Sequence, residues 1–325
     1  MNADWKNSIR ILAFITIIAG CQLSVVYSQE VAPFAYGDMD QWIVREIKES
    51  AVIGGNTKFL YELGPVDTIA GNTAYSNRSG SPWANSNVLA KMGGVVKANT
   101  SVFPEIRGEG KCARMETRLV SVKALGVIDI EVIAAGSIFL GKMHEPVKGT
   151  KNPQSMLECG IAFTQKPKAI RFDYKVKIAP GKQRVRSSGF SRQTTVEGPD
   201  KAMAILFLQK RWEDSNGNVY ARRIGTMAQR YAQSSGGWVN EATYPILYGD
   251  ITSHPEYKDY MKIQTEERYT VNSKGKSVPI RETGWESEQE TPTHIILLFS
   301  SSYGGAYTGS PGNTFWIDNV TLIYE

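Results

Sequence analysis

The sequence has few of the side chains on which most enzyme families build a catalytic centre. Its 325 residues include only three histidines and three cysteines. It contains no H-E-x-x-H, C-x-x-C, G-x-S-x-G or phosphate-binding Walker motif. These absences exclude zincin, dithiol-redox, α/β-hydrolase and P-loop chemistry in their usual forms. Carboxylates and aromatic rings remain as the groups with which this chain could act.

Long runs of one charge are also missing. The formal net charge is +5, and lysine and arginine alternate with aspartate and glutamate along the chain. A nucleic-acid surface needs basic residues gathered in a patch or stripe, so we expect no nucleic-acid partner. The hydrophobic content of 42% is enough for a packed core, which excludes a chain that is disordered throughout.

Residues 1–28 are predicted to be a signal peptide. Lys6 and Arg10 precede an apolar run that is short for a membrane span and typical of a signal-peptide core. The sequence I-A-G-C, which ends at Cys21, resembles a lipobox, in which Cys21 becomes the lipidated first residue. An alternative cut after Ser28 would give ordinary secretion. We expect export to the cell surface or periplasm, with attachment to the outer membrane or cell surface through a lipid anchor if Cys21 is modified.

The two remaining cysteines form an even pair. In an oxidising compartment, Cys112 and Cys159 could form a disulfide. The bond requires a short Cα separation, and Cys112 lies among polar positions of its predicted strand. The sequence leaves this pairing open.

Alternating apolar and polar residues predict an all-β chain. Residues 169–179 alternate strictly, and residues 203–212 form a more apolar strand. Asn216-Gly217 suits a type I′ turn between two strands. Strands separated by turns, with almost no helical pattern, predict a single antiparallel β-sandwich of jelly-roll type over residues 30–325. We expect long loops at 61–87 and 249–290, and either a short helix or an opening strand at 38–50.

Two glutamates are candidate catalytic acids. A pair of carboxylates about 5–10 Å apart could hydrolyse a glycosidic bond. Glu286 lies in the acidic segment T-G-W-E-S-E-Q-E, and Glu116 alternates with Arg114 and Arg118 along one strand. A solvated loop at Glu286 and an ion-paired strand face at Glu116 are the structural alternatives.

Aromatic residues beside predicted turns are candidates for sugar binding. An exposed ring can stack on the apolar face of a pyranose, while neighbouring amides bind its hydroxyl groups. The alternative is that each ring closes over the core. The candidate ligand-binding residues are Trp83, Asn85, Asn87, Trp238, Tyr303 and Tyr307.

Three segments carry a resemblance to a known family. A small-residue loop with G-x-x-F-x-G, a P-x-x-(apolar)-x-F-x-Y-K strand and a glycine-rich ending with a single aspartate resemble PCMD, the putative carbohydrate metabolism domain of Bacteroidota. Residues 81–88 resemble an earlier S-x-W element of that family. The matching positions are Gly136, Phe139, Gly141, Pro167, Phe172, Tyr174, Lys175, Ser301, Ser302, Gly309, Gly312 and Asp318.

The resemblance implies a secreted or lipid-anchored jelly roll that is similar to carbohydrate-binding modules. Many relatives carry an Ig-like domain ahead of the jelly roll, and we expect none here because the signal leads almost directly into residues 33–42. The family has no established catalytic residues to carry over. Related jelly rolls often hold a structural ion near the position of Asp318, so a calcium ion shared by Asp318 and either Asp38 or Asp40 is the one cofactor considered. The alternative is that Asp318 caps a turn or pairs with a lysine or arginine.

Three functions follow from these observations. The first is an exported, non-catalytic protein that recognises an oligo- or polysaccharide. The second is a glycoside hydrolase or polysaccharide lyase that uses a carboxylate pair. The third is a structural component of a surface assembly. Aromatic residues on a concave face favour the first, facing carboxylates the second, and a wide apolar patch the third.

Overall fold

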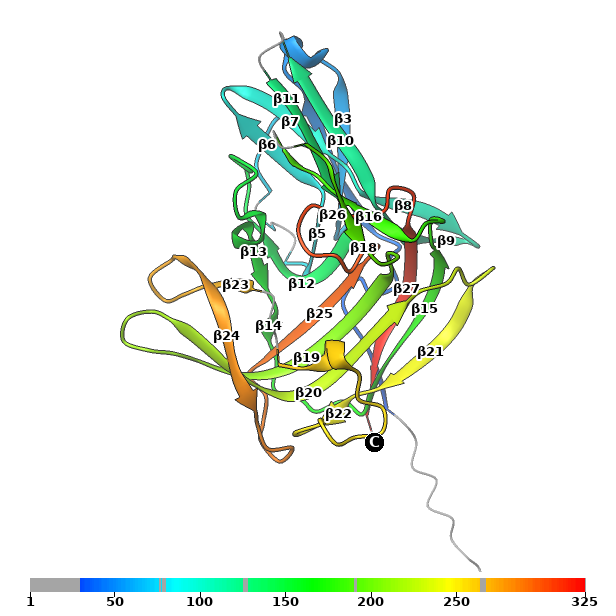
Figure 1. The fold of residues 1–325 in the computed structure, drawn as a ribbon, viewed down its shortest axis with the longest axis vertical. Coiled ribbons are helices and arrows are strands. Elements are labelled where there is room, and N and C mark those ends of the chain that lie inside the picture. Colours follow the sequence, from blue (N-terminus) through cyan, green and yellow to red (C-terminus); the bar gives the residue numbers. More distant parts are fainter. Residues whose placement is uncertain are drawn as a thin grey trace, which may run out of the picture.

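The structure is a computed structural model that describes residues 30–75, 77, 80–124, 128–189, 192–263 and 267–324. Strands dominate it, which confirms the all-β prediction (Figure 1). The predicted signal peptide, with Cys21, lies outside the described residues. Within them, no helix is long and apolar enough to cross a membrane. The helical segments of the described chain are single 3₁₀ turns, η1 (Ala51–Ile53), η2 (Pro153–Met156) and η3 (Asp259–Met261).

Two sheets form the sandwich in the lower half of Figure 1. The six-stranded sheet has the order β21-β15-β27-β9-β8, with β1 added beside β27. Its strands are β21 (Val239–Pro245), β15 (Ala169–Lys177), β27 (Thr314–Ile323), β9 (Gly110–Glu116), β8 (Val102–Arg107) and β1 (Val31–Pro33).

The ten-stranded sheet lies opposite. Its main order is β13-β12-β25-β19-β20-β24-β23, and β5, β14 and β22 pair with β12, β25 and β20. Its strands are β13 (Leu157–Cys159), β12 (Ser137–Met143), β25 (His294–Ser300), β19 (Ala202–Glu213), β20 (Val219–Tyr231), β24 (Ser277–Trp285), β23 (Arg268–Val271), β5 (Trp83–Asn85), β14 (Ile161–Ala162) and β22 (Leu247–Tyr248).

Successive long strands cross between the two sheets. Along the chain, β9, β15, β21 and β27 of the six-stranded sheet alternate with β12, β19 and β20, and β25 of the ten-stranded sheet. This path confirms the jelly-roll sandwich. Most strand pairs are antiparallel, but β20 and β24 pair in parallel, so the sheet is mixed.

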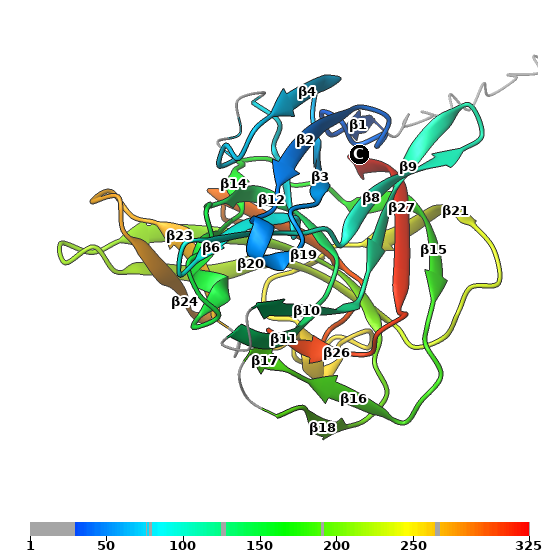
Figure 2. The ribbon, with the colours of Figure 1, turned by 90° about the horizontal axis from the view of Figure 1, so that it is seen from above.

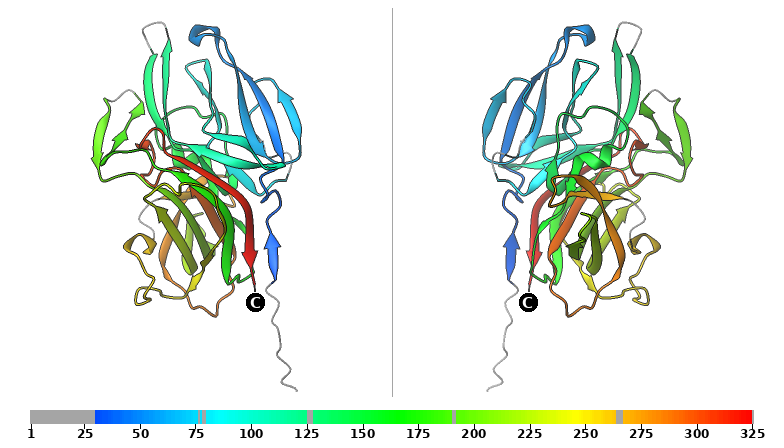
Figure 3. Two further views of the ribbon diagram at one scale, coloured as in Figure 1. Left: turned by 90° about the vertical axis from the view of Figure 1, so that its right-hand side faces the viewer. Right: turned by 90° about the vertical axis from the view of Figure 1, so that its left-hand side faces the viewer.

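Smaller sheets lie beyond one end of the sandwich (Figures 2 and 3). They account for the remaining strands: β2 (Trp42–Lys48), β3 (Thr57–Leu63) and β4 (Asp67–Ala70) in one sheet; β6 (Val88–Met92) and β7 (Val95–Asn99) in a hairpin; β10 (Arg118–Ala124), β11 (Ile128–Ala134) and β17 (Ser188–Gly189) in another sheet; and β16 (Gln183–Arg186), β18 (Thr194–Glu197) and β26 (Thr308–Gly309) in the last.

The main core lies between the two large sheets. Phe172 and Phe315 of the six-stranded sheet meet Phe299 of the ten-stranded sheet, with ring centroids 5.0 and 6.2 Å from Phe299. All three rings are fully buried. Burial of aromatic and aliphatic side chains such as these is the main favourable term in folding, so it holds the two sheets face to face.

Strand β19 is buried on both faces. Ala204, Leu206 and Leu208 face the main core, while Ile205 and Phe207 belong to a second cluster on the opposite face. A continuous apolar run is typical of a strand covered on both sides. The segment 249–263 supplies part of that outer cover, through Ile251 and Met261.

Several local predictions need correction or resolution. Residues 42–48 form strand β2, which settles the helix-or-strand alternative at 38–50. The predicted long loops contain the end of β3 with β4 and β5 in one case, and η3, β23 and β24 in the other. The hairpin is confirmed, because β19 pairs with β20 on either side of residues 214–218. Its turn is not the expected type I′, because that type needs a positive φ at both central residues, and of the two only Gly217 has one.

The two described cysteines are unpaired. Cys112 is a free thiol in β9, and Cys159 is a free thiol in β13 of the other sheet. Burial raises the pKa of Cys112 to about 12, so its thiol stays protonated near neutral pH. The candidate disulfide is therefore absent from the fold.

Candidate functional site

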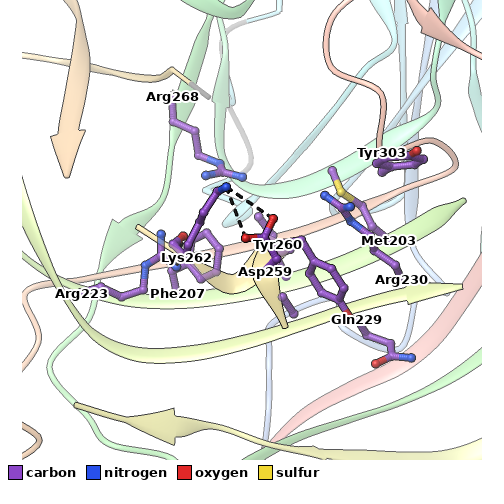
Figure 4. Close-up of a pocket in the computed structure, with 12 residues that line it drawn as sticks. Met203, Phe207, Arg223, Gln229, Arg230, Asp259, Tyr260, Lys262, Arg268 and Tyr303 are labelled. Carbon is purple, nitrogen blue, oxygen red and sulfur yellow. Dashed lines mark hydrogen bonds and ion pairs between the residues drawn. The ribbon is translucent and has the colours of Figure 1, made fainter. Parts of the chain in front are cut away.

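A cavity of about 180 Å³ lies on the face of the ten-stranded sheet that points away from the main core (Figure 4). Its floor comes from β19 and β20, and one wall comes from η3. The loop after β25 and the start of β23 complete it. Its aromatic and charged lining residues are Phe207, Arg223, Arg230, Asp259, Tyr260, Lys262, Arg268 and Tyr303.

Arg230 lies between two tyrosine rings. Its guanidinium carbon is 4.5 Å from the ring centroid of Tyr260 and 4.5 Å from that of Tyr303. Tyr260 belongs to η3 and Tyr303 to the loop after β25, so three separate elements meet at this arginine. A cation against an aromatic face is attracted by the ring quadrupole. The two rings therefore hold the guanidinium in place at the cavity.

A second stack lies deeper in the cavity. The ring of Phe207 has the guanidinium of Arg223 at 3.7 Å and that of Arg268 at 5.2 Å. Arg223 is fully buried, and it forms a two-pronged ion pair with Glu282 on β24. It also donates to the backbone carbonyl oxygen of Met261 at 3.0 Å. Arg223 is thus committed to the structure, and Glu282 balances its charge.

The rest of the cavity has a surplus of positive charge. Among the described lining residues, Asp259 is the one acidic side chain, and that carboxylate is largely exposed and lies 3.4 Å from Lys262. Within the part of the chain that the structure describes, no carboxylate forms an ion pair with Arg230. A half-buried arginine without a counter-ion creates a positive potential that attracts anions.

A β-bulge brings the two arginines of β20 to the same face. Leu208 pairs with Gly225, but the next residue, Gln209, pairs with Arg223, so Ile224 is an extra residue on β20. Strand side chains alternate between faces, and Arg223 and Arg230, seven residues apart, would otherwise point to opposite sides. The bulge shifts this alternation by one residue.

The loop that carries Tyr303 is anchored by a buried carboxylate. Asp200 accepts a hydrogen bond from the Ser302 hydroxyl at 2.8 Å and one from the Ser310 backbone amide at 2.7 Å. Asp200 and Ser302 are both buried. These bonds hold both ends of the loop and so position the Tyr303 ring over Arg230.

A second, larger cavity of about 340 Å³ adjoins the first. It lies between the ten-stranded sheet and the β6–β7 and β10–β11 hairpins, and its lining is mostly apolar. Met203 and Arg268 line both cavities. The predicted ligand residue Tyr307 lines this second cavity, and burial raises the pKa of its hydroxyl to about 12.

The structure assigns Trp83, Asn85 and Asn87 to the interior. Trp83 is 1% exposed, and its indole donates to the Ala35 carbonyl oxygen at 2.8 Å. The two amides are also buried, and both donate to the carbonyl oxygen of Tyr61. A fully buried ring offers no face to a sugar, so these three predicted binding residues are corrected to core residues.

Trp238 is half-buried on the outer face of the six-stranded sheet. The guanidinium carbon of Arg107 lies 3.9 Å from its ring, and Arg107 also donates to Asn240 at 2.7 Å. The ring is therefore engaged by the protein itself. Trp238 and Tyr303 lie on different sheets, so the predicted aromatic set does not form one site.

The two candidate catalytic glutamates do not face each other. Glu116 ends β9 and pairs with Arg114 on the same strand, which is the ion-paired face that the alternation with arginine indicated. Glu286 follows β24 and lies 3.8 Å from Arg222. Neither lines the cavity, so the geometry does not assemble the pair that a glycosidase needs.

Asp318 and Asp40 have different partners. One guanidinium nitrogen of Arg107 donates to the Asp318 carboxylate at 2.6 Å and to the Asp173 carboxylate at 2.8 Å. Asp40 accepts the backbone amide of Lys111 at 2.6 Å. Among the described residues, no group of three or more histidine, cysteine or acidic side chains could hold a metal ion. A guanidinium thus lies where the sequence suggested a cation, and the calcium ion stays a prediction.

The pKa values of this carboxylate pair shift in opposite directions. Burial raises the pKa of Asp318 to about 6, against the opposing effect of Arg107. Burial also acts on Asp173, but hydrogen bonds from Glu241, Asn319 and Arg107 outweigh it and lower the pKa. One guanidinium cannot fully compensate two carboxylates, so Asp318 is the one that takes up a proton first.

Sequence reasoning missed most of the cavity. It named Tyr303 but not Arg230, Tyr260 or Phe207, which lie in or beside segments assigned to ordinary strands and a loop. One signal was available: Arg223 and Arg230 lie on either side of a short, mainly apolar segment, residues 224–228, that is buried throughout. Arginine on such a strand needs a partner or a cavity.

Comparison with solved structures finds remote similarities. One is a putative glycoside hydrolase from Bacteroides thetaiotaomicron, with 17% identity over 83% of this chain and 75% of that one, and a TM-score of 0.42. Another is a putative glycoside hydrolase from Bacteroides vulgatus, with 16% identity over 90% and 94% of the two chains and a TM-score of 0.40. The third is a non-crystalline cellulose specific carbohydrate-binding module, CBM28, with 11% identity over 77% and 92% and a TM-score of 0.26. Similarities this remote carry no argument about function.

The family comparison is decisive. No curated protein matches the chain. The family described as putative carbohydrate metabolism domain, PCMD, matches residues 66–323, which includes every strand from β4 to β27 and the whole cavity. The match covers well over half of the chain and agrees with the resemblance in its three sequence segments. The chain therefore belongs to the PCMD family of carbohydrate metabolism domains.

Proposed function

We propose that this protein recognises an oligo- or polysaccharide without cleaving it, and that the ligand binds in the cavity on the ten-stranded sheet. Membership of a carbohydrate metabolism family supports a sugar ligand. The observation that carries the proposal is the composition of the cavity: tyrosine rings and guanidinium groups gather there, while the one acidic side chain of the described lining is the exposed Asp259.

The cavity offers the groups that sugar binding uses. Arginine and tyrosine donate hydrogen bonds to hydroxyl groups, and a ring face packs against the C–H face of a pyranose. Tyr260 comes from η3 and Tyr303 from the loop after β25, and Arg230 between them supplies N–H donors. Met203 beside them leads into the apolar second cavity, so a chain longer than one sugar has further surface to contact.

Hydrolysis would need a different arrangement. A glycosidase places two carboxyl groups on either side of the bond that it breaks. Glu282 is fully buried and holds Arg223, and Glu116 and Glu286 lie outside the cavity. This distribution favours binding over turnover for the described residues.

The location is proposed from the sequence. We propose export to the cell envelope, with lipid attachment at Cys21 and a role at the cell surface or in the periplasm. Intact-mass analysis of the native protein tests this point. A soluble protein that begins at Gln29 would replace lipid anchoring with plain secretion.

A glycan-array screen combined with a reducing-end release assay on every hit tests the function. We expect retained glycans that stay intact over prolonged incubation. Arg230→Gln serves as the site variant. Arg222→Gln is the matched control, because Arg222 lies on the same strand but is exposed and pairs with Glu286. No retained glycan would contradict the binding proposal, and cleavage of a retained glycan would establish the enzyme alternative.

A further inference from the structure

We infer that the ligand of this cavity is an anionic saccharide, one that carries a carboxylate or a sulfate, and that Arg230 binds the anionic group between Tyr260 and Tyr303. This inference rests on the proposed function and names the class of its ligand. It goes beyond the family, whose description specifies no sugar.

The geometry of Arg230 suits an anionic group. Its guanidinium lies 4.5 Å from each of two ring centroids, so the rings take up contacts around it. A planar guanidinium presents its N–H donors in a fixed fork that matches a carboxylate or sulfate in a two-pronged contact. The flanking rings restrict the side chain, so less conformational entropy is lost when an anion binds.

Two other cations of this cavity have acidic partners. Arg223 is neutralised by Glu282, and Lys262 faces the exposed Asp259. Among the described lining residues, Arg230 therefore keeps a positive charge that no carboxylate balances, and a cavity partly closed to water strengthens its effect on an anion.

Arg230 differs in its partners from two other stacked arginines. Arg107 lies over Trp238 and is ion-paired with Asp173 and Asp318. Arg184 lies 4.5 Å from the Tyr303 ring and donates to the backbone carbonyl oxygens of Glu197 and Gly198. Arg230 has two rings but no ion pair within the described residues. An acidic ligand supplies the missing partner.

Oligogalacturonate and its methyl ester form the most direct pair of probes, because esterification removes the charge and keeps the sugar ring. Dextran sulfate and dextran form the corresponding pair for sulfate. Isothermal titration of the full chain with each probe gives the ratio of affinities, acidic over neutral. We expect a ratio of at least tenfold for one of the two pairs, with a decline as salt rises.

Three variants complete the experiment. Arg230→Gln should bring the ratio close to one, Arg230→Lys should restore part of it, and Arg222→Gln should leave it unchanged. Thermal unfolding of each variant confirms that it is folded. Because the ratio is measured within one protein, a general loss of affinity does not mimic the result.

Two outcomes overturn the inference. If neutral and acidic probes bind equally to the natural protein, the ligand is not selected by charge, although the proposed function stands. If the acidic preference survives Arg230→Gln, the anion is recognised at another place. Failure of every glycan on a broad array would overturn the proposed function itself, which keeps the two failures distinct.

Discussion

Two surfaces of this protein use the same side chains and differ in how their charges are balanced. On the outer face of the six-stranded sheet, Arg107 lies over Trp238 and joins Asp173 to Asp318. On the cavity face of the ten-stranded sheet, Arg230 lies between Tyr260 and Tyr303 and has no carboxylate partner within the described residues.

The difference separates a structural site from a candidate binding site. A stacked arginine whose donors are taken by buried carboxylates stabilises the fold and has little left to offer a ligand. A stacked arginine at a cavity whose N–H donors have no carboxylate partner can still bind an anionic ligand. The number of aromatic rings is therefore a poorer guide to function here than the pairing of the cations beside them.

The largest expected effect is a loss of stability when the ion pairs on the outer face of the six-stranded sheet are removed. Arg107→Met leaves Asp173 and Asp318 buried without their cation, which should cost about 3–5 kcal/mol of unfolding free energy. Urea unfolding measures the loss. Arg171→Met on the same sheet is the control, because its partner Glu241 is exposed and such surface pairs contribute only about 0–1 kcal/mol. Equal losses in both variants would contradict the assigned role of Arg107.

The second effect concerns pH. Asp318 has an ordinary pKa of 3.8 that is raised to about 6 in the fold, so the folded state keeps a proton that the unfolded state releases. Its stabilising contribution is complete below pH 3.8 and is lost as the pH rises through about 6, by about 1–3 kcal/mol. Asp173, with its lowered pKa, acts in the opposite sense below about pH 4.

Urea unfolding at pH 4.5 and pH 7.5 checks this sign. Glu62, whose pKa burial raises to about 8, acts in the same sense as Asp318 over this range, and His294, whose pKa burial lowers to about 4, acts in the opposite sense. The contribution of Asp318 is therefore read from the variant: Asp318→Asn should lower the stability at pH 4.5 relative to that at pH 7.5 by about 1–3 kcal/mol, compared with the natural protein. An unchanged difference between the two pH values in the variant would contradict the assigned role of Asp318.

The third effect compares the two aromatic sites directly. Tyr303→Ala should weaken glycan binding by about 1 kcal/mol, because Arg230 loses one of its two flanking rings. Trp238→Ala should leave glycan binding unchanged, since its ring contacts Arg107 on the other sheet. Titration with the best glycan of the array measures both. A larger loss of binding in Trp238→Ala than in Tyr303→Ala would place the binding site on the six-stranded sheet.

The smallest expected effect is that of metal removal. Asp318 is held by Arg107, and Asp40 by the Lys111 amide. We therefore expect EDTA to leave the melting temperature of the natural protein unchanged. A fall in the melting temperature that calcium reverses would contradict this expectation and support the predicted calcium ion.

Much of the fold could be predicted because it depends on local pattern. The strict alternation in β15 and the hairpin turn between β19 and β20 act through neighbouring residues, and both are confirmed. The predicted loop at 61–87 was less predictable. It contains the end of β3 with β4 and β5, whose pairing depends on distant strands such as β12.

The candidate site was predictable only in part. Tyr303 was identified because it lies beside a glycine-rich turn, the usual place for an exposed ring. Trp83 has the same local signature, yet it is buried and bonded to Ala35. A turn places a ring at the end of a strand, but packing by other segments decides whether the ring faces solvent or the core.

The sequence by itself determined the strands, the main turns and the family. Hydrophobic alternation and turn chemistry act over a few residues, and the family segments are linear. Only the tertiary structure decided which arginine is paired and which is open. Arg107 meets Asp318 across 211 residues of chain, and the bulge at Ile224 turns Arg223 and Arg230 to one face. Charge balance depends on side chains that lie close in space, and long-range strand pairing alone sets that proximity.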